Sequence, residues 1–268
     1  MISAESAIRS LRRDLTLSSM LKFTLTAIGL VCLMFGPMFG SGIAIVVIML
    51  FVGAIVLVLS YRSAKGSSLA ADSPMLIASG QFDEAEQRIE QVLRTFSLFR
   101  AVKLLSLHHL AVLRHAQRRW RESALLSRAL LRQRLGSLQS ISRSSRLMLA
   151  DSLLELGDLA GAHEALSSLY RERLTLVEAM NLLVVQLDYE ARIGAWNAMT
   201  HNLGAKVQLA ELMPSASAAK SQAFLALAAR KLDRDDWAKW LAGRAALLAD
   251  VNGLVAERPI LKDVLLSD

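Results

Sequence analysis

The longest apolar stretch of the chain lies near its N-terminus. No charged residue occurs between Lys22 and Arg62, which leaves 39 consecutive uncharged and mainly apolar residues. A helix of about 20 apolar residues crosses the hydrocarbon core of a bilayer, so this stretch suffices for two crossings. A glycine and proline cluster at residues 36–42 interrupts it and predicts a tight turn. The pattern therefore predicts two membrane helices, at about residues 21–35 and 43–61.

The first 20 residues have an amphipathic pattern. Ile2, Ile8, Leu11 and Leu15 fall near one face of a helix, and three arginines lie mainly off that face. A basic amphipathic helix can lie in the membrane interface with its basic residues near lipid phosphates. We expect either such an interfacial helix or a frayed N-terminus here.

Beyond the hairpin the chain has helical periodicity. Residues 62–73 are small and polar and predict a linker, after which Ser73 and Pro74 are typical of a helix start. Apolar residues then recur at helical spacing, the chain has only four prolines, and good helix formers dominate. We therefore predict an all-α protein. The expected parts are a basic N-terminal segment 1–20, a transmembrane hairpin 21–61, a linker 62–73, a helical repeat domain 74–250 and a C-terminal cap 251–268.

A short turn pattern recurs through the predicted repeat domain. A helix ends, a small or polar turn follows, and an apolar residue comes just after it. The apolar marker residues are Phe82, Trp120, Leu159, Trp196 and Trp237. Their spacings are 38, 39, 37 and 41 residues, which is more even than unrelated turns would give. Self-similarity at such a period predicts a repeat architecture, in which neighbouring helix pairs stack to bury their apolar faces.

These turns resemble those of the tetratricopeptide repeat family, in which a Gly-x-aromatic-x-x-Ala turn joins the two helices of a repeat. Two triplets match this turn best, Gly80/Phe82/Ala85 and Gly157/Leu159/Ala162. The chain departs from the family in its period, which exceeds about 34 residues, and in the turn glycine, which Arg118 and Asp235 replace. The resemblance implies a tetratricopeptide-like α-solenoid of about five helix pairs that binds protein partners. Its repeat-packing residues would be Gly80, Phe82, Ala85, Trp120, Gly157, Leu159, Ala162, Trp196 and Trp237.

The net charge of +7 is concentrated in one segment. Residues 99–147 carry eleven basic residues against a single acid, Glu122. The candidate basic face consists of Arg114, Arg118, Arg119, Arg121, Arg128, Arg132 and Arg134. Anionic lipid headgroups and an acidic protein segment are equally suitable ligands for it. Nucleic acid is disfavoured because Trp120 is the only aromatic residue available for stacking, and a plain solvated face is the remaining alternative.

The sequence shows no pattern typical of a catalytic, cofactor or metal site. His108 and His115 are two helical turns apart, roughly 10 Å, which is too far to share one metal ion directly. No phosphate-binding glycine loop, nucleophile elbow or zinc motif occurs. The single cysteine, Cys32, excludes an intrachain disulfide. We therefore expect no catalytic residues, no cofactor, no metal and no enzymatic activity.

Basic residues flank the hairpin on both sides. Arg9, Arg12, Arg13 and Lys22 precede it, and Arg62 and Lys65 follow it. Because basic flanks stay in the cytoplasm, both termini are expected there, whether the hairpin spans the bilayer or re-enters it. We predict an integral protein of a bacterial inner membrane that serves as a scaffold for a protein partner. The alternative is a structural membrane protein that oligomerises or shapes the bilayer, with the helical domain as its coat.

Overall fold

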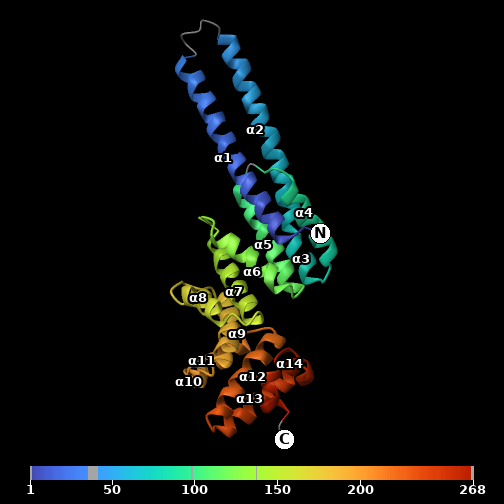
Figure 1. Cartoon of the computed structure of the whole chain (residues 1–268), viewed down its shortest axis with the longest axis vertical. Helices are drawn as coiled ribbons and strands as arrows, with labels where there is room; N and C mark the ends of the chain where they lie inside the picture. The colour runs from blue at the N-terminus through green and yellow to red at the C-terminus, as the bar shows by residue number, and fades with distance from the viewer. Residues whose placement is uncertain (1, 36–41, 98, 137, 267–268) are drawn as a thin grey trace. The chain divides into compact units, whose positions relative to one another are not determined.

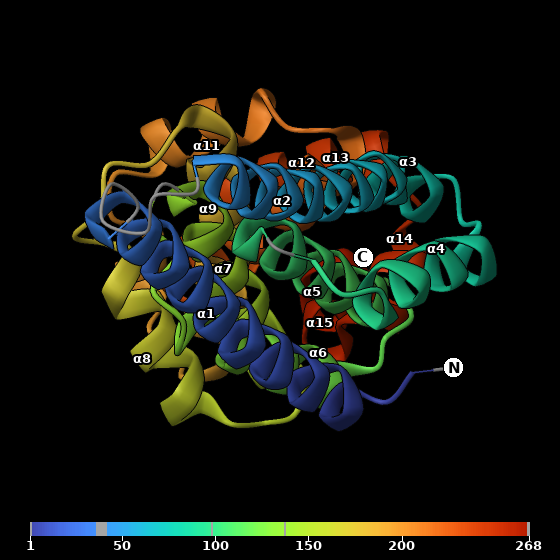
Figure 2. The same cartoon turned by 90° about the horizontal axis from the view of Figure 1, so that it is seen from above.

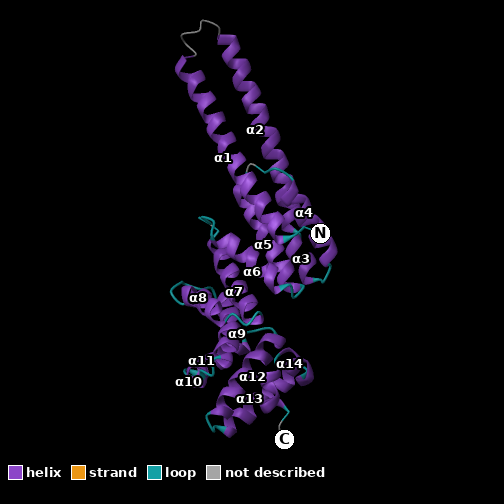
Figure 3. Cartoon of the chain, in the orientation of Figure 1, coloured by secondary structure: helices purple, strands orange, loops and turns teal. Residues whose placement is uncertain are grey.

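The computed structural model describes residues 2–35, 42–97, 99–136 and 138–266. Within these ranges the chain consists of helices and loops without strands, as Figure 3 shows. The prediction of an all-α protein is therefore confirmed. The predicted glycine and proline turn lies outside the described residues, except for Gly42.

The helices form two compact units, residues 1–148 and 149–268. The first unit contains α1 (Ala4–Phe35), α2 (Gly42–Ala71), α3 (Ser73–Ala78), α4 (Phe82–Arg94), α5 (Arg100–Ala116) and α6 (Trp120–Leu131). Helix α7 (Gln139–Glu155) begins in the first unit and ends in the second. The second unit continues with α8 (Leu159–Leu169), α9 (Leu176–Arg192), α10 (Trp196–Thr200), α11 (Leu203–Glu211), α12 (Ser215–Lys231), α13 (Asp235–Leu248), α14 (Val251–Glu257), η2 (Pro259–Leu261) and α15 (Lys262–Leu265).

Helices α1 and α2 form an antiparallel pair whose far ends project beyond the other helices of the first unit (Figure 1). Both are long and apolar enough to cross a membrane, over Ala4–Val31 and Val46–Gly66. Large apolar side chains in these stretches are exposed, among them Phe23 and Leu50. Water does not favour such a surface, whereas lipid does. The predicted pair of apolar helices of membrane-spanning length is therefore present.

The beginning of α1 differs from the prediction. Ile2, Ala4, Ala7 and Leu11 are buried in the core of the first unit, where they join residues of α4, α5 and α6. The apolar face of this segment therefore packs on protein and does not lie in the membrane interface. It is not frayed either, because the helix is continuous from Ala4 onward.

The predicted linker also differs, because α2 continues through it to Ala71. Ser63 is buried there and accepts a hydrogen bond from Ser97 Oγ at 3.1 Å. Gly66 approaches the side chains of Val92 and Val102. The small residues of this segment thus permit close helix packing. Helices α1 and α2 both pack against α5 and flank it when seen from above (Figure 2).

A buried ion pair fixes α1 to the helices behind it. Lys103 Nζ of α5 lies 2.6 Å from Asp14 Oδ2 of α1, and both side chains are almost completely buried. The same Nζ donates to the carbonyls of Val92 and Leu93, the latter of which also accepts a bond from Ser10 Oγ. These carbonyls belong to the last turn of α4, where they lack partners within the helix. One lysine therefore joins three helices.

Five turns of the chain share one backbone conformation. Each contains a residue with φ between 56° and 78°, namely Gly80, Arg118, Gly157, Gly194 or Asp233. The N–H of that residue donates to the carbonyl three residues earlier, and the next N–H donates to the carbonyl five residues earlier. This is the Schellman arrangement that ends α-helices. The turns join the pairs α3/α4, α5/α6, α7/α8, α9/α10 and α12/α13, in agreement with the predicted five helix pairs.

The helices after these turns begin at Phe82, Trp120, Leu159, Trp196 and Asp235, at intervals of 38, 39, 37 and 39 residues. The first four starts coincide with the predicted markers. In the fifth turn the helix begins at Asp235, two residues before the marker Trp237. The observed period is therefore more even than the predicted one.

Helix α12 is the centre of the second unit. Residues 221–229 of this helix are all buried, and α9, α10, α11, α13 and α15 pack around it. A helix that is buried on every side needs small or apolar residues all round, and this one is rich in alanine. The C-terminal stretch, predicted as a cap, buries Leu254, Leu261 and Val264.

Candidate functional site

Arg114 does not belong to a surface, contrary to the predicted basic face. Its side chain is 0% exposed and forms two bonds with Glu86, at 2.8 and 2.9 Å. It also contacts Glu122 at 3.1 Å and donates to the carbonyl of Ile2 at 2.9 Å. The bond from Arg114 holds the pKa of Glu86 below its usual range. Arg114 therefore fixes the start of α1 inside the first unit.

The other predicted basic residues lie at or near the surface, in or beside α6. Arg121, Arg128 and Arg132 are exposed and follow one another at spacings of seven and four residues, so they share one face. Arg118 and Arg134 are exposed before and after the helix. Arg119 is only partly exposed and pairs with Glu122. The basic face thus extends along α6 from one end of the helix to the other.

The predicted repeat-packing residues range from buried to exposed. Ala85 and Ala162 are completely buried, and Phe82 and Trp196 pack against the cores of their units. Gly80 and Gly157 occupy the left-handed position of their turns, and Leu159 is half-buried. Trp120 lies edge-on to His115 with ring centroids 5.0 Å apart. Among the five apolar marker residues only Trp237 is exposed, at 49%.

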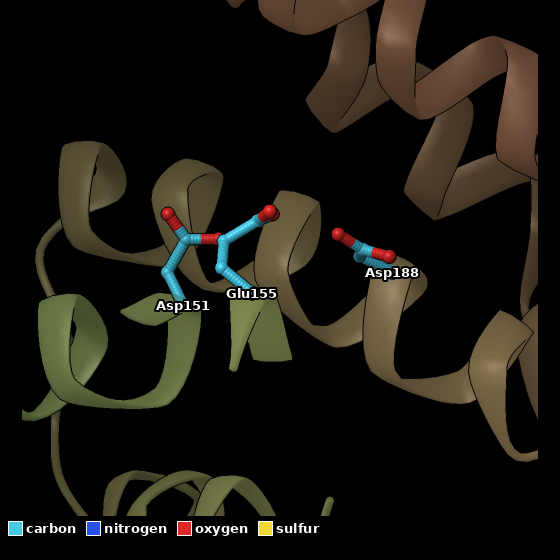
Figure 4. A group of neighbouring side chains, drawn as sticks. All are labelled: Asp151, Glu155 and Asp188. Atoms are coloured by element: carbon cyan, nitrogen blue, oxygen red, sulfur yellow. The ribbon is translucent and has the colours of Figure 1, made fainter. Parts of the chain in front are cut away.

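Three acidic side chains of the second unit converge. Figure 4 shows Asp151 and Glu155 on α7 and Asp188 extending toward them from α9. One carboxylate oxygen of each lies within 4.8 Å of the others. Carboxylates grouped in this way can bind a cation, unless basic side chains beside them already balance their charge.

Two arginines occupy the space beside this cluster. Arg258 Nε lies 2.8 Å from Asp188 Oδ2, and its Nη2 pairs with Glu155. Arg192 Nε lies 2.9 Å from Asp188 Oδ1 and its Nη1 donates to the carbonyl of Leu154. Burial alone would lower the pKa of Arg258, but Asp188 and Glu155 raise it above its usual value. The guanidinium groups neutralise the acids, so the cluster is a structural network that fastens the C-terminal segment.

A groove between α11 and α13 is the best candidate for binding. Its volume is about 560 Å³, and it is lined by Leu203, Gly204, Val207, Gln208, Glu211, Asp236, Trp237 and Trp240. Trp237 and Trp240 are about half exposed. Exposed tryptophans are unusual on a surface that has no partner, and they are enriched where proteins bind.

The groove combines apolar walls with an acidic edge. Arg244 lies over the ring of Trp240, 5.1 Å from its centroid, and bonds to Glu211 at 2.6 Å. These contacts hold the indole and the carboxylate in place. Asp236 is exposed in the first turn of α13. The groove can therefore accept an apolar side chain, and Asp236 can accept a neighbouring positive charge.

This groove was not predicted from the sequence. Trp237 was assigned to packing between helices, and Trp240 was not considered. The signal present in the sequence is the spacing of three between the two tryptophans, which places them on one helical face, directly after Asp235 and Asp236.

Comparisons with known proteins give no relative for this chain. No protein-family model matches it, and searches of the curated proteins and of the solved structures find no match.

Proposed function

We propose that this protein is a membrane-anchored scaffold that binds a protein partner through the groove between α11 and α13. The groove with Trp237 and Trp240 is the observation that carries the proposal. The pair of apolar helices at the other end of the chain supports anchoring in a membrane. The protein would hold its partner close to the bilayer and perform no chemistry on it.

The chemistry of the groove defines the kind of partner. Trp237, Trp240 and Val207 offer apolar contact area, and buried aromatic contacts supply much of the affinity in protein interfaces. Asp236 offers negative charge at the edge, whereas the charge of Glu211 is balanced by Arg244. The second unit also carries sixteen acids against twelve basic residues. The expected ligand is therefore a polypeptide segment with one or two apolar anchors beside lysine or arginine.

The proposed location follows from the basic flanks of the hairpin. Arg9, Arg12, Arg13 and Arg62 are exposed in the first unit. Basic residues beside membrane helices favour the cytoplasmic side, so we propose that both units lie in the cytoplasm of a bacterial cell, at the inner membrane. The tetratricopeptide resemblance supports a role in binding proteins.

The groove can be filled without disturbing the fold. A Cβ at Gly204 meets no atom within 4 Å, so Gly204→Leu projects a side chain into the open groove. We expect this variant and Trp237→Ala each to weaken partner capture at least about tenfold, the loss typical of an interface hot spot. Leu247→Ala is the matched control, because Leu247 is also exposed on α13 but does not line the groove.

The measurement is photo-crosslinking in native membranes. A photoreactive amino acid replaces Gln208, which lines the groove, or Leu247 as the control position. A discrete partner crosslinked from position 208, and lost in Gly204→Leu, is the expected result. Crosslinking only between copies of this chain would favour the alternative of an oligomerising coat protein. Equal partner capture by Gly204→Leu, Trp237→Ala and the unchanged chain would refute the proposal.

A further inference from the structure

We propose that the end of the first unit from which the hairpin leaves binds the headgroups of anionic phospholipids. The binding residues are those of a membrane-facing rim, defined as Arg62, Lys65, Arg132 and Arg134 together with Phe99. This inference rests on the membrane anchoring of the proposed function, and it adds a ligand and a surface that the groove does not involve.

Hydrogen bonds and ion pairs place the rim residues at one level of the unit. Helices α1 and α5 are antiparallel in register, because Ile2 O meets Arg114 at one end and Asp14 meets Lys103 nearer the other. Extending this register by three residues places Arg100 about level with Leu17.

Two further contacts extend this level to α2 and to the end of α6. Ser97 Oγ, three residues before Arg100, donates to Ser63 of α2 at 3.1 Å. Arg100 Nη2 donates to Gln133 Oε1 at 3.3 Å, and Gln133 lies between Arg132 and Arg134. The rim residues therefore come from different helices but share one end of the unit.

The apolar surface of the hairpin begins at this same level. On α1, Leu17 is 48% exposed, Met20 63% and Phe23 77%, whereas Leu11 is buried. On α2, the 20 residues from Gly42 to Tyr61 are uncharged and extend about 30 Å, which matches the hydrocarbon core. The headgroup layer would therefore surround the rim.

The rim is basic, exposed and partly aromatic. Arg62, Lys65, Arg132 and Arg134 are all exposed, and Phe99 is 44% exposed. Lys22 lies further along α1, and its long side chain can extend back toward the headgroups.

Two acids toward this end of the unit are paired within it. Asp14 pairs with Lys103, and Glu90 pairs with Arg94. The sequence has no acid between Glu122 and Asp151, the stretch that contains Arg132 and Arg134. The rim therefore presents net positive charge to the bilayer.

Anionic lipid is a better ligand for this rim than an acidic protein. Each basic residue near an anionic membrane surface strengthens the binding of a protein to that surface by about fivefold. The attraction decays within a Debye length. The rim is basic, and its position beside the apolar helices keeps it within a Debye length of the headgroups. A protein ligand would have to displace lipid from the same place.

The test uses the full chain in nanodiscs with equal amounts of phosphatidylglycerol and phosphatidylcholine. After mild detergent release, native mass spectrometry counts the lipids of each class that the protein retains. We expect a preference for phosphatidylglycerol that falls about fivefold or more in R132Q/R134Q, and that persists in R132K/R134K.

The matched control is R9Q/R121Q, which removes the same charge from exposed positions away from the rim. Arg121 lies eleven residues before Arg132 along the chain, about 16 Å along the helix axis, which exceeds a Debye length. This control should keep the preference. A preference that falls equally in both variants would reflect net charge and overturn the proposal.

Two other outcomes separate this inference from the proposed function, and a third overturns both. Equal retention of both lipids by the unchanged chain overturns lipid binding by the rim. It leaves partner capture by the groove untouched. Binding of polyglutamate to the rim, without lipid preference, assigns it to acidic protein and also overturns the inference. Release of the chain from membranes by alkaline carbonate overturns both proposals.

Discussion

At the scale of single residues, His108 shows what burial does to a titratable group. It lies in α5, its Nδ1 is 3.2 Å from Ser145 Oγ, and it is almost completely buried. Burial, and to a lesser degree the neighbouring His109, lowers the pKa of His108 to about 4. The imidazole is therefore neutral at neutral pH and acts as a polar core residue.

This lowered pKa predicts a pH dependence of stability. In the unfolded chain histidine has a pKa of about 6.5, so between about pH 6.5 and 4 the unfolded state binds more protons than the folded state. Stability should therefore fall as the pH is lowered through this range, by roughly 2–3 kcal/mol. Urea unfolding of the full chain in detergent, followed by circular dichroism, measures the slope.

The variant His108→Gln should remove most of that slope, because glutamine does not titrate and can still bond to Ser145. His201→Gln is the control, since His201 is exposed in the second unit. Glu86 adds its own loss of stability below about pH 5, because Arg114 lowers its pKa in the folded state. This loss is common to the unchanged chain and to His108→Gln, so it cancels in the comparison. Equal slopes in the unchanged chain and His108→Gln would contradict the prediction.

At the scale of elements, the five helix-ending turns show how far local sequence determines structure. Three of the five left-handed positions are glycine, which adopts positive φ without steric cost. Those turns were predictable, as was Trp120, because an aromatic residue marks the helix start. The fifth turn was placed two residues late because no glycine marks it: Asp233 takes the left-handed conformation, and Trp237 lies within the first turn of α13.

The helical structure of the predicted linker was harder to predict from the sequence. Residues 62–71 are small and polar, a composition that suits a loop and also suits a closely packed helix. The choice depends on Ser97, Val92 and Val102, which approach from distant parts of the chain. Local composition cannot reveal such neighbours, because they follow from tertiary packing.

The turn at Gly157 allows a clean test of the cost of left-handed backbone. Its φ is +77°, and a Cβ placed there meets no atom within 4 Å. The substitution Gly157→Ala therefore adds no clash with the surroundings, and we expect it to destabilise the protein by about 1–2 kcal/mol through conformation alone. The shift of the urea unfolding midpoint measures this cost.

Gly243→Ala is the matched control for this substitution. Gly243 lies within α13, where a Cβ also meets no atom within 4 Å, but its backbone is helical. Alanine should stabilise that position by up to about 1 kcal/mol. The two alanine variants should thus move stability in opposite directions, and a shift of the same sign in both would refute the conformational explanation.

At the scale of the whole molecule, the two units differ in charge, and the apolar hairpin belongs to the first. The first unit carries nineteen basic and eight acidic residues, whereas the second carries twelve and sixteen. The basic face lies on the unit with the hairpin, and the acidic-edged groove lies on the other. This division fits one unit that contacts lipid and a second unit that contacts a basic protein segment.

The burial of the first residues could not be predicted from the sequence. An amphipathic helix presents the same pattern whether its apolar face meets lipid or protein. The packing of this segment on protein depends on Arg114, whose partners Glu86 and Ile2 lie 28 and 112 residues away in the sequence. Because Arg114 stands among many arginines, nothing local distinguishes the one that is buried.

This packing predicts that helices α4–α6 of the first unit do not fold without α1. A fragment of residues 66–268 lacks Ile2, Ala7 and Leu11 from the core and lacks the partner of Lys103, Asp14. Removing one partner of a buried ion pair costs about 3–5 kcal/mol, and each large buried apolar side chain contributes about 1.5–3 kcal/mol. The total is comparable to the roughly 5–15 kcal/mol that holds a whole domain together.

Limited proteolysis of the fragment tests this prediction. We expect rapid cleavage within residues 82–131 and slow cleavage within residues 215–248, because α12 and α13 pack inside the second unit. A synthetic peptide of residues 1–22 should restore protection to α4–α6, whereas the same peptide with Leu11→Asp and Asp14→Ala should not. Equal protease resistance of α4–α6 in the fragment and in the full chain would show that the hairpin is only a tether, and that the buried contacts of α1 contribute little to the fold.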